Sequence, residues 1–182
     1  MISGKLRNRK GWTLIELMIA IALIGIISAF AIPGYLAGMP LRRLKADAMD
    51  ITSNMKYAKM KAVQRNINVG VYFNSGGSAV NGVDPDAYCV YEDSGSTPNV
   101  FDSTDNRLKP NIKLKTGVKF DTVNWTINDD NAGNNTVIFK TNGSAIFGPV
   151  TTGNNSGTVV IKNGSLTRSI VLTKITGRIQ IP

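Results

Sequence analysis

The residue whose type and position most directly suggest chemistry is Glu16. It is the only charged residue between Lys10 and Arg42, and the stretch from Leu17 to Leu41 is uncharged. An ionisable side chain at the centre of a membrane helix costs about 2.5–3.5 kcal/mol, so such a residue is expected to have a partner or a function. A carboxylate in this position could neutralise a positive charge in apolar surroundings.

The composition excludes the common catalytic centres. The chain has 182 residues and no histidine, and Cys89, which we expect in the core, is its single cysteine. Ser-His-Asp and Cys-His nucleophile pairs, zinc sites built from His and Cys, and an intramolecular disulfide are therefore excluded. An enzyme would have to use carboxylates, Lys, Ser or Tyr, and we expect a non-catalytic protein without a cofactor.

The stretch that carries the carboxylate is long enough to cross a bilayer. Its apolar part reaches the roughly 20 residues that a membrane-spanning helix needs. A basic leader with Lys5, Arg7, Arg9 and Lys10 precedes it, and positive residues keep that end in the cytoplasm. Because these four cations lie before Trp12, a chain that begins at Trp12 keeps +5 of the net charge of +9.

Two processing schemes fit the N-terminus. An ordinary secretory signal would be cleaved after the apolar stretch, where Ala29-Phe30-Ala31 has the small-x-small form of such a site. The string K-G-W-T-L-I-E-L-M, which begins at Lys10, instead resembles the leader of type IV pilins and pseudopilins. That resemblance implies cleavage after Gly11 by the prepilin peptidase, N-methylation of the new first residue Trp12, and retention of the apolar helix. Trp12 stands where the family usually has phenylalanine.

The same resemblance implies a role for Glu16 in assembly. The carboxylate lies four residues after Trp12, whose amine cleavage would free, and it would neutralise the amine of an adjacent subunit. An unpaired charge is costly in a low dielectric, so this pairing would select the register between subunits. The alternative is that Glu16 reaches the headgroups from its place about 6 Å into the helix.

Helix breakers follow the apolar stretch. Pro33-Gly34 and Gly38-Met39-Pro40 predict a kink or a locally melted stretch, and in pilins the corresponding region loosens when subunits pack into a fibre. Residues 41–66 resume a helical pattern with one apolar stripe, which would seat a globular domain. The stripe contains Leu44, Ala48, Ile51, Met55, Ala58 and Ala62.

After Asn66 the composition changes to β-branched residues, Gly and Asn, which predicts β-structure. Asn142-Gly143 and Asn163-Gly164 are hairpin signals, so roughly the last 50 residues are expected to form an antiparallel meander. The predicted strands are 67–73, 87–91, 112–120, 124–127, 136–140, 144–147, 158–162 and 169–173.

The closing strands resemble those of the GspH/FimT group of pseudopilins. The matching residues are Val137 to Gly143, Arg168 to Leu172 and Gly177-Arg178-Ile179, with Ala58, Lys59 and Ala62 ahead of the first strand. The group favours arginine where Lys59 stands. Some FimT-like proteins capture DNA for transformation through a C-terminal Gly-Arg followed two residues later by a second arginine, and this chain has Gln180 there.

A DNA site at the C-terminus is therefore the alternative function. Arg178 is its central candidate, and Lys162, Arg168 and Lys174 could add charge if they lie on the same face. Phosphate binding scales with the number of cations that make contacts. The missing second arginine favours scattered solubilising cations over a DNA site.

The acidic residues give no strong site. The expected loops 92–106 and 128–135 carry oxygen-rich pairs that could hold calcium, namely Asp102 with Asp105, and Asp129-Asp130. Neither pair belongs to a spaced series of three or more ligands, so solvated loops without a metal are expected. Asp93-Ser94-Gly95 has the form of an aspartic-protease half-motif, but it lacks a second copy and is expected to be a turn.

These observations predict an α+β fold, in which a long N-terminal helix packs on a C-terminal antiparallel β-rich domain. The expected parts are a leader (1–11), a transmembrane and assembly helix (12–40), its amphipathic continuation (41–66) and a periplasmic β-rich globular domain (67–182). A secreted β-domain enzyme released after Ala31 is a third interpretation, which the missing histidine and the leader motif disfavour.

The predicted function is that of a minor pilin or pseudopilin. The chain would be a single-pass protein of the bacterial inner membrane that is incorporated into a pilus or pseudopilus, for type II secretion or type IV pilus biogenesis. Its partners would be other pilins or pseudopilins, the prepilin peptidase, the inner-membrane assembly platform and the membrane itself.

Overall fold

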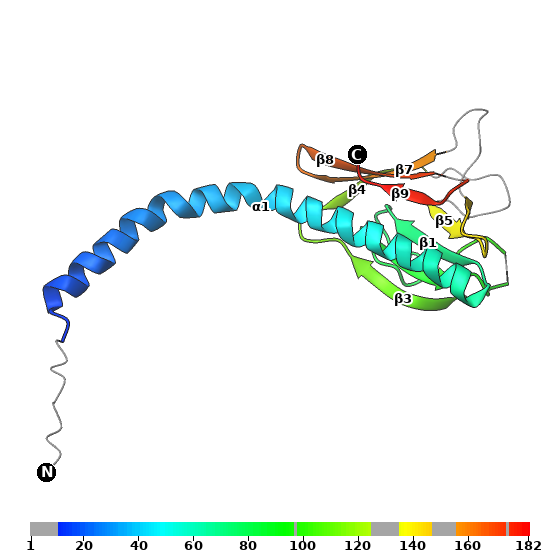
Figure 1. Cartoon of the computed structure of the whole chain (residues 1–182), viewed down its shortest axis with the longest axis horizontal. Helices are drawn as coiled ribbons and strands as arrows, with labels where there is room; N and C mark the ends of the chain where they lie inside the picture. The colour runs from blue at the N-terminus through cyan, green and yellow to red at the C-terminus, as the bar shows by residue number, and fades with distance from the viewer. Residues whose placement is uncertain (1–10, 97, 125–134, 147–155, 174) are drawn as a thin grey trace, which may run out of the picture. The chain divides into compact units, whose positions relative to one another are not determined.

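The structure is a computed structural model that describes residues 11–96, 98–124, 135–146, 156–173 and 175–182 (Figure 1). The chain divides into two units, Met1–Met39 and Pro40–Pro182. The described elements are α1 (Leu14–Arg65), β1 (Val69–Asn74), β2 (Ala87–Glu92), β3 (Asn106–Lys113), β4 (Lys119–Asn124), β5 (Thr136–Phe139), β6 (Ala145–Ile146), β7 (Ser156–Asn163), β8 (Leu166–Thr173) and β9 (Arg178–Gln180). One long helix followed by antiparallel strands confirms the predicted α+β class.

The first unit contains the apolar half of α1. Leu, Ile and Ala dominate this half, and its large side chains are exposed, for example Ile24 at 63% and Phe30 at 81%. An 18-residue window has a mean hydropathy of 2.6, and none of it is buried within the chain. By length and composition the helix can cross a membrane.

The predicted melted stretch at the prolines is wrong. Helix α1 runs without interruption from Leu14 to Arg65 and includes Pro33-Gly34 and Pro40. A proline removes one backbone hydrogen-bond donor, but its fixed φ is close to the helical value. Helix-forming neighbours on both sides can therefore keep the backbone helical despite the lost hydrogen bond. A kink at Pro33-Gly34 remains a prediction.

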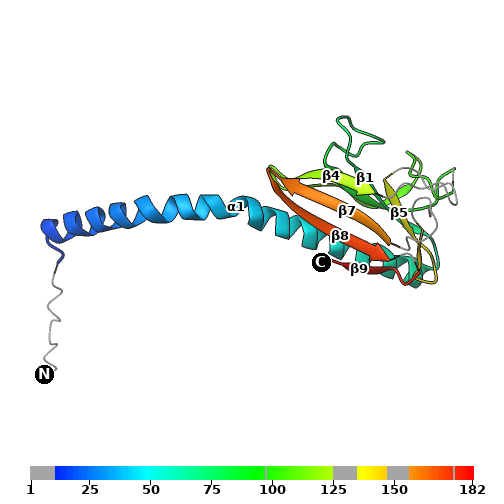
Figure 2. The same ribbon diagram turned by 90° about the horizontal axis from the view of Figure 1, so that it is seen from above.

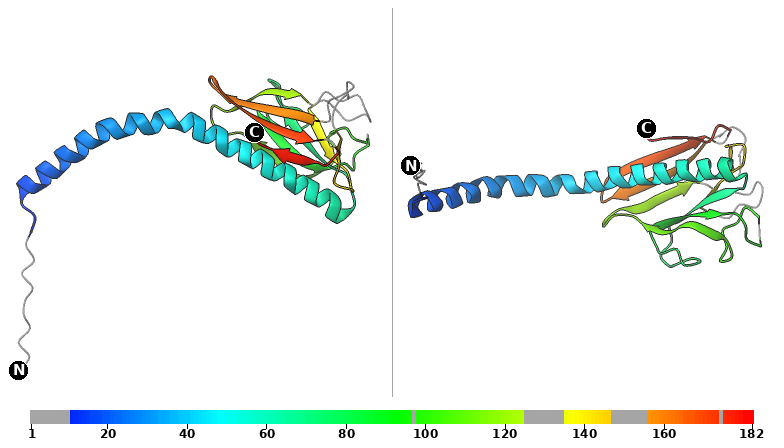
Figure 3. Two further views of the ribbon diagram at one scale, coloured as in Figure 1. Left: turned by 45° about the horizontal axis from the view of Figure 1, so that its top comes forward. Right: turned by 60° about the horizontal axis from the view of Figure 1, so that its bottom comes forward.

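The second half of α1 belongs to the second unit and is part of its core. The predicted apolar stripe is confirmed, because all six of its residues are buried, and Asp47 and Thr52 are buried beside them. In Figure 1 the strands β7, β8 and β9 lie above this half of the helix and β3 lies below it, and the left view of Figure 3 shows both groups of strands over one side of the helix.

A left-handed residue ends the helix. Asn66 has a φ of 54°, which asparagine tolerates better than most residues. The N–H of Ile67 then donates to the carbonyl of Ala62 at 3.3 Å, the six-to-one bond of a Schellman motif. The chain therefore turns directly from α1 into the first strand.

The strands form two antiparallel sheets. One has the order β3-β2-β1-β5-β6 and the other the order β4-β7-β8-β9. The prediction of one strand over 112–120 is wrong, because β3 ends at Lys113 and β4 begins at Lys119 in the other sheet. Gly117 lies in the turn between them with a φ of 86°. Alternating apolar residues cannot distinguish one long strand from two strands that a turn separates.

The predicted C-terminal meander is only partly right. The Asn-Gly hairpins are confirmed, since β5 pairs with β6 and β7 pairs with β8. The two hairpins, however, lie in different sheets, and β5 also pairs with β1 through the Val71–Val137 register. Local hairpin signals fix neighbouring pairs, whereas the choice of sheet depends on distant strands.

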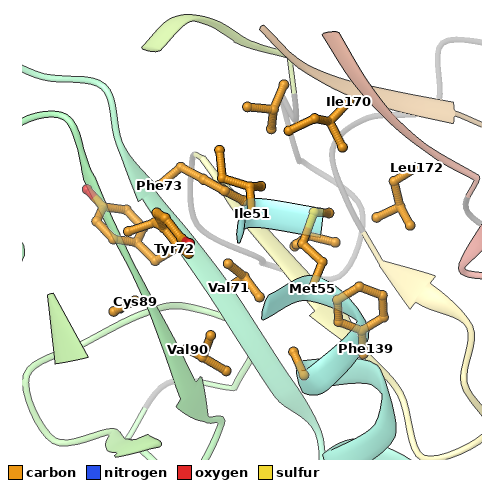
Figure 4. Packing of buried hydrophobic residues seen from close by; sticks show 14 of the residues in the cluster. Ile51, Met55, Val71, Tyr72, Phe73, Cys89, Val90, Phe139, Ile170 and Leu172 are labelled. Atoms are coloured by element: carbon orange, nitrogen blue, oxygen red, sulfur yellow. The ribbon is translucent and has the colours of Figure 1, made fainter. Parts of the chain in front are cut away.

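The core is one cluster shared by α1 and both sheets (Figure 4). In Figure 4, Ile51 and Met55 of the helix lie between Val71 of β1 and the pair Ile170 and Leu172 of β8. Burial of such side chains contributes roughly 1.5–3 kcal/mol each. The helix therefore joins two sheets that have no strand pair in common among the described residues.

Two features of the first sheet depend on particular residues, a close contact at Gly70 and the buried thiol of Cys89. Gly70 of β1 lies directly opposite Tyr91 of β2, and a Cβ atom on Gly70 would be 2.2 Å from Cζ of the tyrosine ring. The Cys89 thiol is fully buried and free, as predicted, and burial raises its pKa to about 12. A thiol in these surroundings is unreactive at neutral pH.

Candidate functional site

The N-terminal segment of the described chain presents the residues predicted for processing and assembly. Gly11, Trp12 and Thr13 precede α1 and are not helical, and Trp12 is 80% exposed. A Cβ atom on Gly11 would meet nothing within 4 Å. The peptide bond between Gly11 and Trp12 therefore lies in an open, non-helical stretch directly before the helix.

Thr13 and Glu16 form a capping box at the start of α1. Oε2 of Glu16 accepts hydrogen bonds from the backbone N–H of Thr13 at 2.8 Å and from its hydroxyl at 3.0 Å. Oγ1 of Thr13 in turn accepts from the N–H of Glu16 at 3.3 Å. This reciprocal arrangement satisfies donors that a helix start leaves unpaired. This role of Thr13 was not among the predictions, although the spacing T-x-x-E indicates it.

The capping box leaves part of the carboxylate open. Among the described residues, hydrogen bonds reach Oε2 of Glu16, and none reaches Oε1. Glu16 is exposed, so its second oxygen can accept a hydrogen bond from an incoming cation while the first holds the helix start. The arrangement can therefore serve as a local cap and as a partner for a charge from another chain.

Two of the C-terminal cations, Arg168 and Arg178, lie on opposite faces of their sheet. Arg178 of β9 lies opposite Thr173 of β8, whereas Arg168 lies five positions earlier on β8. Successive side chains alternate across a strand, so the two arginines belong to opposite faces of the sheet. Nε of Arg168 is buried and has no hydrogen-bond partner among the described residues. Lys174 lies outside the described residues.

Other contacts involve the remaining members of the predicted DNA site. Lys162 pairs with Asp121. Gln180, which stands where the second arginine was expected, lies beside Arg178, and its amide oxygen can accept from Nε at 2.9 Å and from Nη2 at 2.6 Å. By the β7–β8 register, Lys162 lies on the same face of the sheet as Arg178, but six positions away along β8, roughly 20 Å. Among the described residues, the cations therefore form no compact basic cluster for a DNA site at this end of the chain.

Gly177 has a structural role that explains the Gly-Arg sequence. Its φ is 57°, and a Cβ atom on it would be 2.4 Å from the backbone oxygen of Gly143. Nζ of Lys59 donates to the carbonyl oxygens of Thr176 at 2.8 Å and Gly177 at 3.3 Å. Lys59 thus ties the segment before β9 to α1, a contact that the sequence alone did not reveal.

Replacing Gly177 with alanine is expected to destabilise the second unit by about 3 kcal/mol or more, because a strained φ and a backbone clash act together. Gly164 is the matched control. It has a φ of 61° and open space around its Cβ position, so Gly164→Ala should cost only about 1 kcal/mol. Urea unfolding of the detergent-solubilised chain measures both, and equal costs would contradict the packing argument.

The acidic loop before β3 uses its carboxylates to order its own backbone. Oδ1 of Asp105 accepts from the N–H groups of Ser94 at 3.1 Å and Gly95 at 2.9 Å, and Oδ2 accepts from the N–H of Asp102 at 2.8 Å. Burial raises the pKa of Asp93, whereas the hydrogen bond that the N–H of Asn99 donates to its carboxylate acts in the opposite direction. Asp93-Ser94-Gly95 is thus part of a loop, as predicted.

No described His, Cys, Asp or Glu residues form a group of three that could hold a metal ion. The pair Asp102 and Asp105 is therefore not extended into a calcium site by its described neighbours. The second pair proposed for calcium, Asp129-Asp130 in the loop 128–135, lies outside the described residues.

Two family profiles match the chain. The profile described as "Type II transport protein GspH" matches residues 47–176, which is more than half of the sequence. The profile described as "Prokaryotic N-terminal methylation motif" matches residues 6–32. The first match runs from the second half of α1 through β8, and the second covers the end of the leader and most of the apolar stretch.

Individual proteins resemble different parts of the chain. The type IV major fimbrial protein FimA of Dichelobacter nodosus is 70% identical over 27 residues, which are 15% of this chain and 17% of that relative. The chain thus matches less than a fifth of the length of these curated relatives. This likeness concerns one short segment.

Solved structures resemble the chain as a fold. The type IV minor pilin FimU of Pseudomonas aeruginosa superposes with a TM-score of 0.52 at 15% identity, covering 78% of this chain and 89% of FimU. The minor pseudopilin EpsH of the type 2 secretion system of Vibrio cholerae gives a TM-score of 0.46 at 13% identity, with 77% and 96% covered. The likeness in fold rests on the first of these structures.

Proposed function

Since the chain belongs to the GspH family of type II transport proteins, we propose that α1 first anchors it in a membrane and then carries it into a pilus or pseudopilus. The chain is a structural subunit of the minor pilin and pseudopilin class, not an enzyme. Association with other pilins or pseudopilins follows from the family.

The observation that supports this proposal most strongly is the bare apolar half of α1. An 18-residue window of mean hydropathy 2.6 has no buried residue within its own chain. At about 25 cal/mol per Å² of apolar surface, leaving such a helix in water would cost far more than a folded domain gains in stability. Two surroundings remove this cost: the lipid tails of a membrane before assembly, and the helices of neighbouring subunits within a fibre.

Processing at Gly11 would prepare the helix for both states. The prepilin peptidase would cut the open peptide bond before Trp12, on the cytoplasmic side where the basic leader lies, and would leave the span attached. The first residue would then be an N-methylated Trp12. The proposed parts are the leader 1–11, the membrane and assembly helix 12–40, its continuation 41–66 and the periplasmic strands 67–182.

Assembly would use the open oxygen of Glu16. A cleaved neighbour carries a cationic amine at Trp12, and a carboxylate in the same apolar layer lowers the cost of burying that amine. The pairing is proposed for the fibre of either a type II secretion system or a type IV pilus, where the inner-membrane assembly platform would receive the subunit.

The mass of the chain in its own membrane fraction tests the proposal. We expect a chain that starts at Trp12 with one added methyl group, because the leader is removed and the span retained. A strain without prepilin peptidase is the control and should give the full-length chain. A chain that starts at Ile32 would contradict the proposal, because the apolar helix would then have been cleaved off as an ordinary signal.

A further inference from the structure

Three segments that are distant in the sequence meet at the end of the second unit where α1 enters it. Nη1 of Arg43 donates to the carbonyl of Thr116 at 3.0 Å, and Nδ2 of Asn163 donates to the carbonyl of Pro40 at 3.5 Å. We call the residues 40–45, 114–119 and 163–166 the basic end. Figure 2 shows the turn between β7 and β8 and the start of β4 at this end.

The basic end carries five cations and no carboxylate. They are Arg42, Arg43, Lys45, Lys115 and Lys119. Lys115 pairs with Asp47 at 3.1 Å and with Asp50 at 2.9 Å, which lie just outside the basic end. Within the described part of the chain, Arg43, Lys45 and Lys119 form no ion pair. Lys119 also lies directly opposite Lys162 in the β4–β7 register, and Lys162 pairs with Asp121.

Two leucines are exposed among these cations. Leu41 and Leu166 are each 39% exposed, Leu41 in the first turn of α1 within this unit and Leu166 as the first residue of β8. The segments of the basic end contain no aromatic residue on which a base could stack. Cations around exposed leucines are typical of a surface that enters the headgroup layer of a bilayer.

We propose that the basic end docks on anionic phospholipid headgroups while α1 is stored in the membrane. The inference rests on the membrane storage proposed above, because Leu41 follows the apolar stretch directly and the headgroups lie at that level. The lysines and arginines pair with lipid phosphates, and the leucines enter the layer between them. The docked domain is thereby held against the bilayer until the helix is extracted.

A fluorescent probe on the full chain in liposomes tests the docking. Ser165 is exposed in the turn between β7 and β8, so Ser165→Cys can carry an environment-sensitive dye, while the buried Cys89 stays unlabelled. Thr141→Cys is the control position, because its turn packs near Val63, roughly 33 Å further along the helix than Leu41 at 1.5 Å per residue. Bromolipid quenching reports contact with the bilayer.

We expect quenching at residue 165, and none at residue 141, in liposomes that contain phosphatidylglycerol. Pure phosphatidylcholine or high salt should abolish it. Lys45→Gln with Lys119→Gln should lower the docked-to-free ratio about twenty-fivefold, at roughly fivefold for each cation. The matched pair Lys56→Gln with Lys61→Gln should leave that ratio unchanged.

Three outcomes would overturn the proposal. Equal quenching in both lipids, or quenching that the double variant at the basic end leaves unchanged, would mean that the tether alone brings the domain near the bilayer. A probe that responds to added DNA but not to phosphatidylglycerol would assign the basic end to nucleic acid. If alkaline carbonate extracts the chain from liposomes, both the docking and the proposed membrane storage are contradicted. If the chain is retained but shows no lipid-dependent quenching, only the docking is contradicted.

Discussion

Replacing Gly70 with alanine is expected to destabilise the second unit by about 3 kcal/mol or more. The added Cβ atom would lie 2.2 Å from Cζ and 2.5 Å from the hydroxyl oxygen of Tyr91. The tyrosine ring is fully buried and packs against Phe101, with ring centroids 4.8 Å apart and an interplanar angle of 49°, so moving the ring away from the new atom would disturb the core. Urea unfolding of the detergent-solubilised chain, followed by near-ultraviolet circular dichroism, measures the loss.

Gly77→Ala is the matched control for this substitution. A Cβ atom on Gly77 would meet nothing within 4 Å, so the variant should change the free energy of unfolding by less than about 0.5 kcal/mol. A similar cost at both glycines would mean that backbone freedom, and not the contact with Tyr91, determines the effect at Gly70.

Replacing Glu16 with alanine or glutamine is expected to reduce incorporation into a fibre by more than about a hundredfold, because either change leaves the amine of a neighbour unpaired in an apolar layer. Cleavage after Gly11 and methylation of Trp12 should continue in both variants. The amount of chain in sheared fibres relative to the membrane fraction measures incorporation, and intact mass measures processing.

The two variants separate the two roles of Glu16. Glutamine can still accept the hydrogen bond from the N–H of Thr13, so it keeps the capping box and removes only the charge. Alanine removes both. If the glutamine variant assembles normally and the alanine variant does not, the residue acts through the helix cap, and charge pairing between subunits is contradicted.

Features that depend on local sequence were predicted well. The apolar stripe from Leu44 to Ala62 follows from helical spacing, and the hairpins at Asn142-Gly143 and Asn163-Gly164 follow from a left-handed turn that glycine permits. The family resemblance at both ends was confirmed, because its motifs are short strings of adjacent residues.

Features that depend on distant contacts could not be predicted in this way. The contact of Gly70 with Tyr91 joins two strands, and the hydrogen bond from Lys59 to Thr176 joins residues that are 117 positions apart in the sequence. The separation of Arg168 from Arg178 required the strand register, since neither residue shows from sequence alone which face it occupies. The assignment of β5 and β7 to different sheets also depends on pairings with strands elsewhere in the chain.

The continuity of α1 has a mechanical consequence. A pulling force applied to the apolar half would enter the second unit through the middle of its core, because eight residues of the same helix are buried there. Load along the helix axis would have to shear that whole face at once, whereas load on an edge strand would peel hydrogen bonds one at a time. Near the end of the helix, Lys59 adds a tie to the chain around Gly177. Extraction of the helix from the membrane, as proposed above, would therefore load the element through which the domain best resists force.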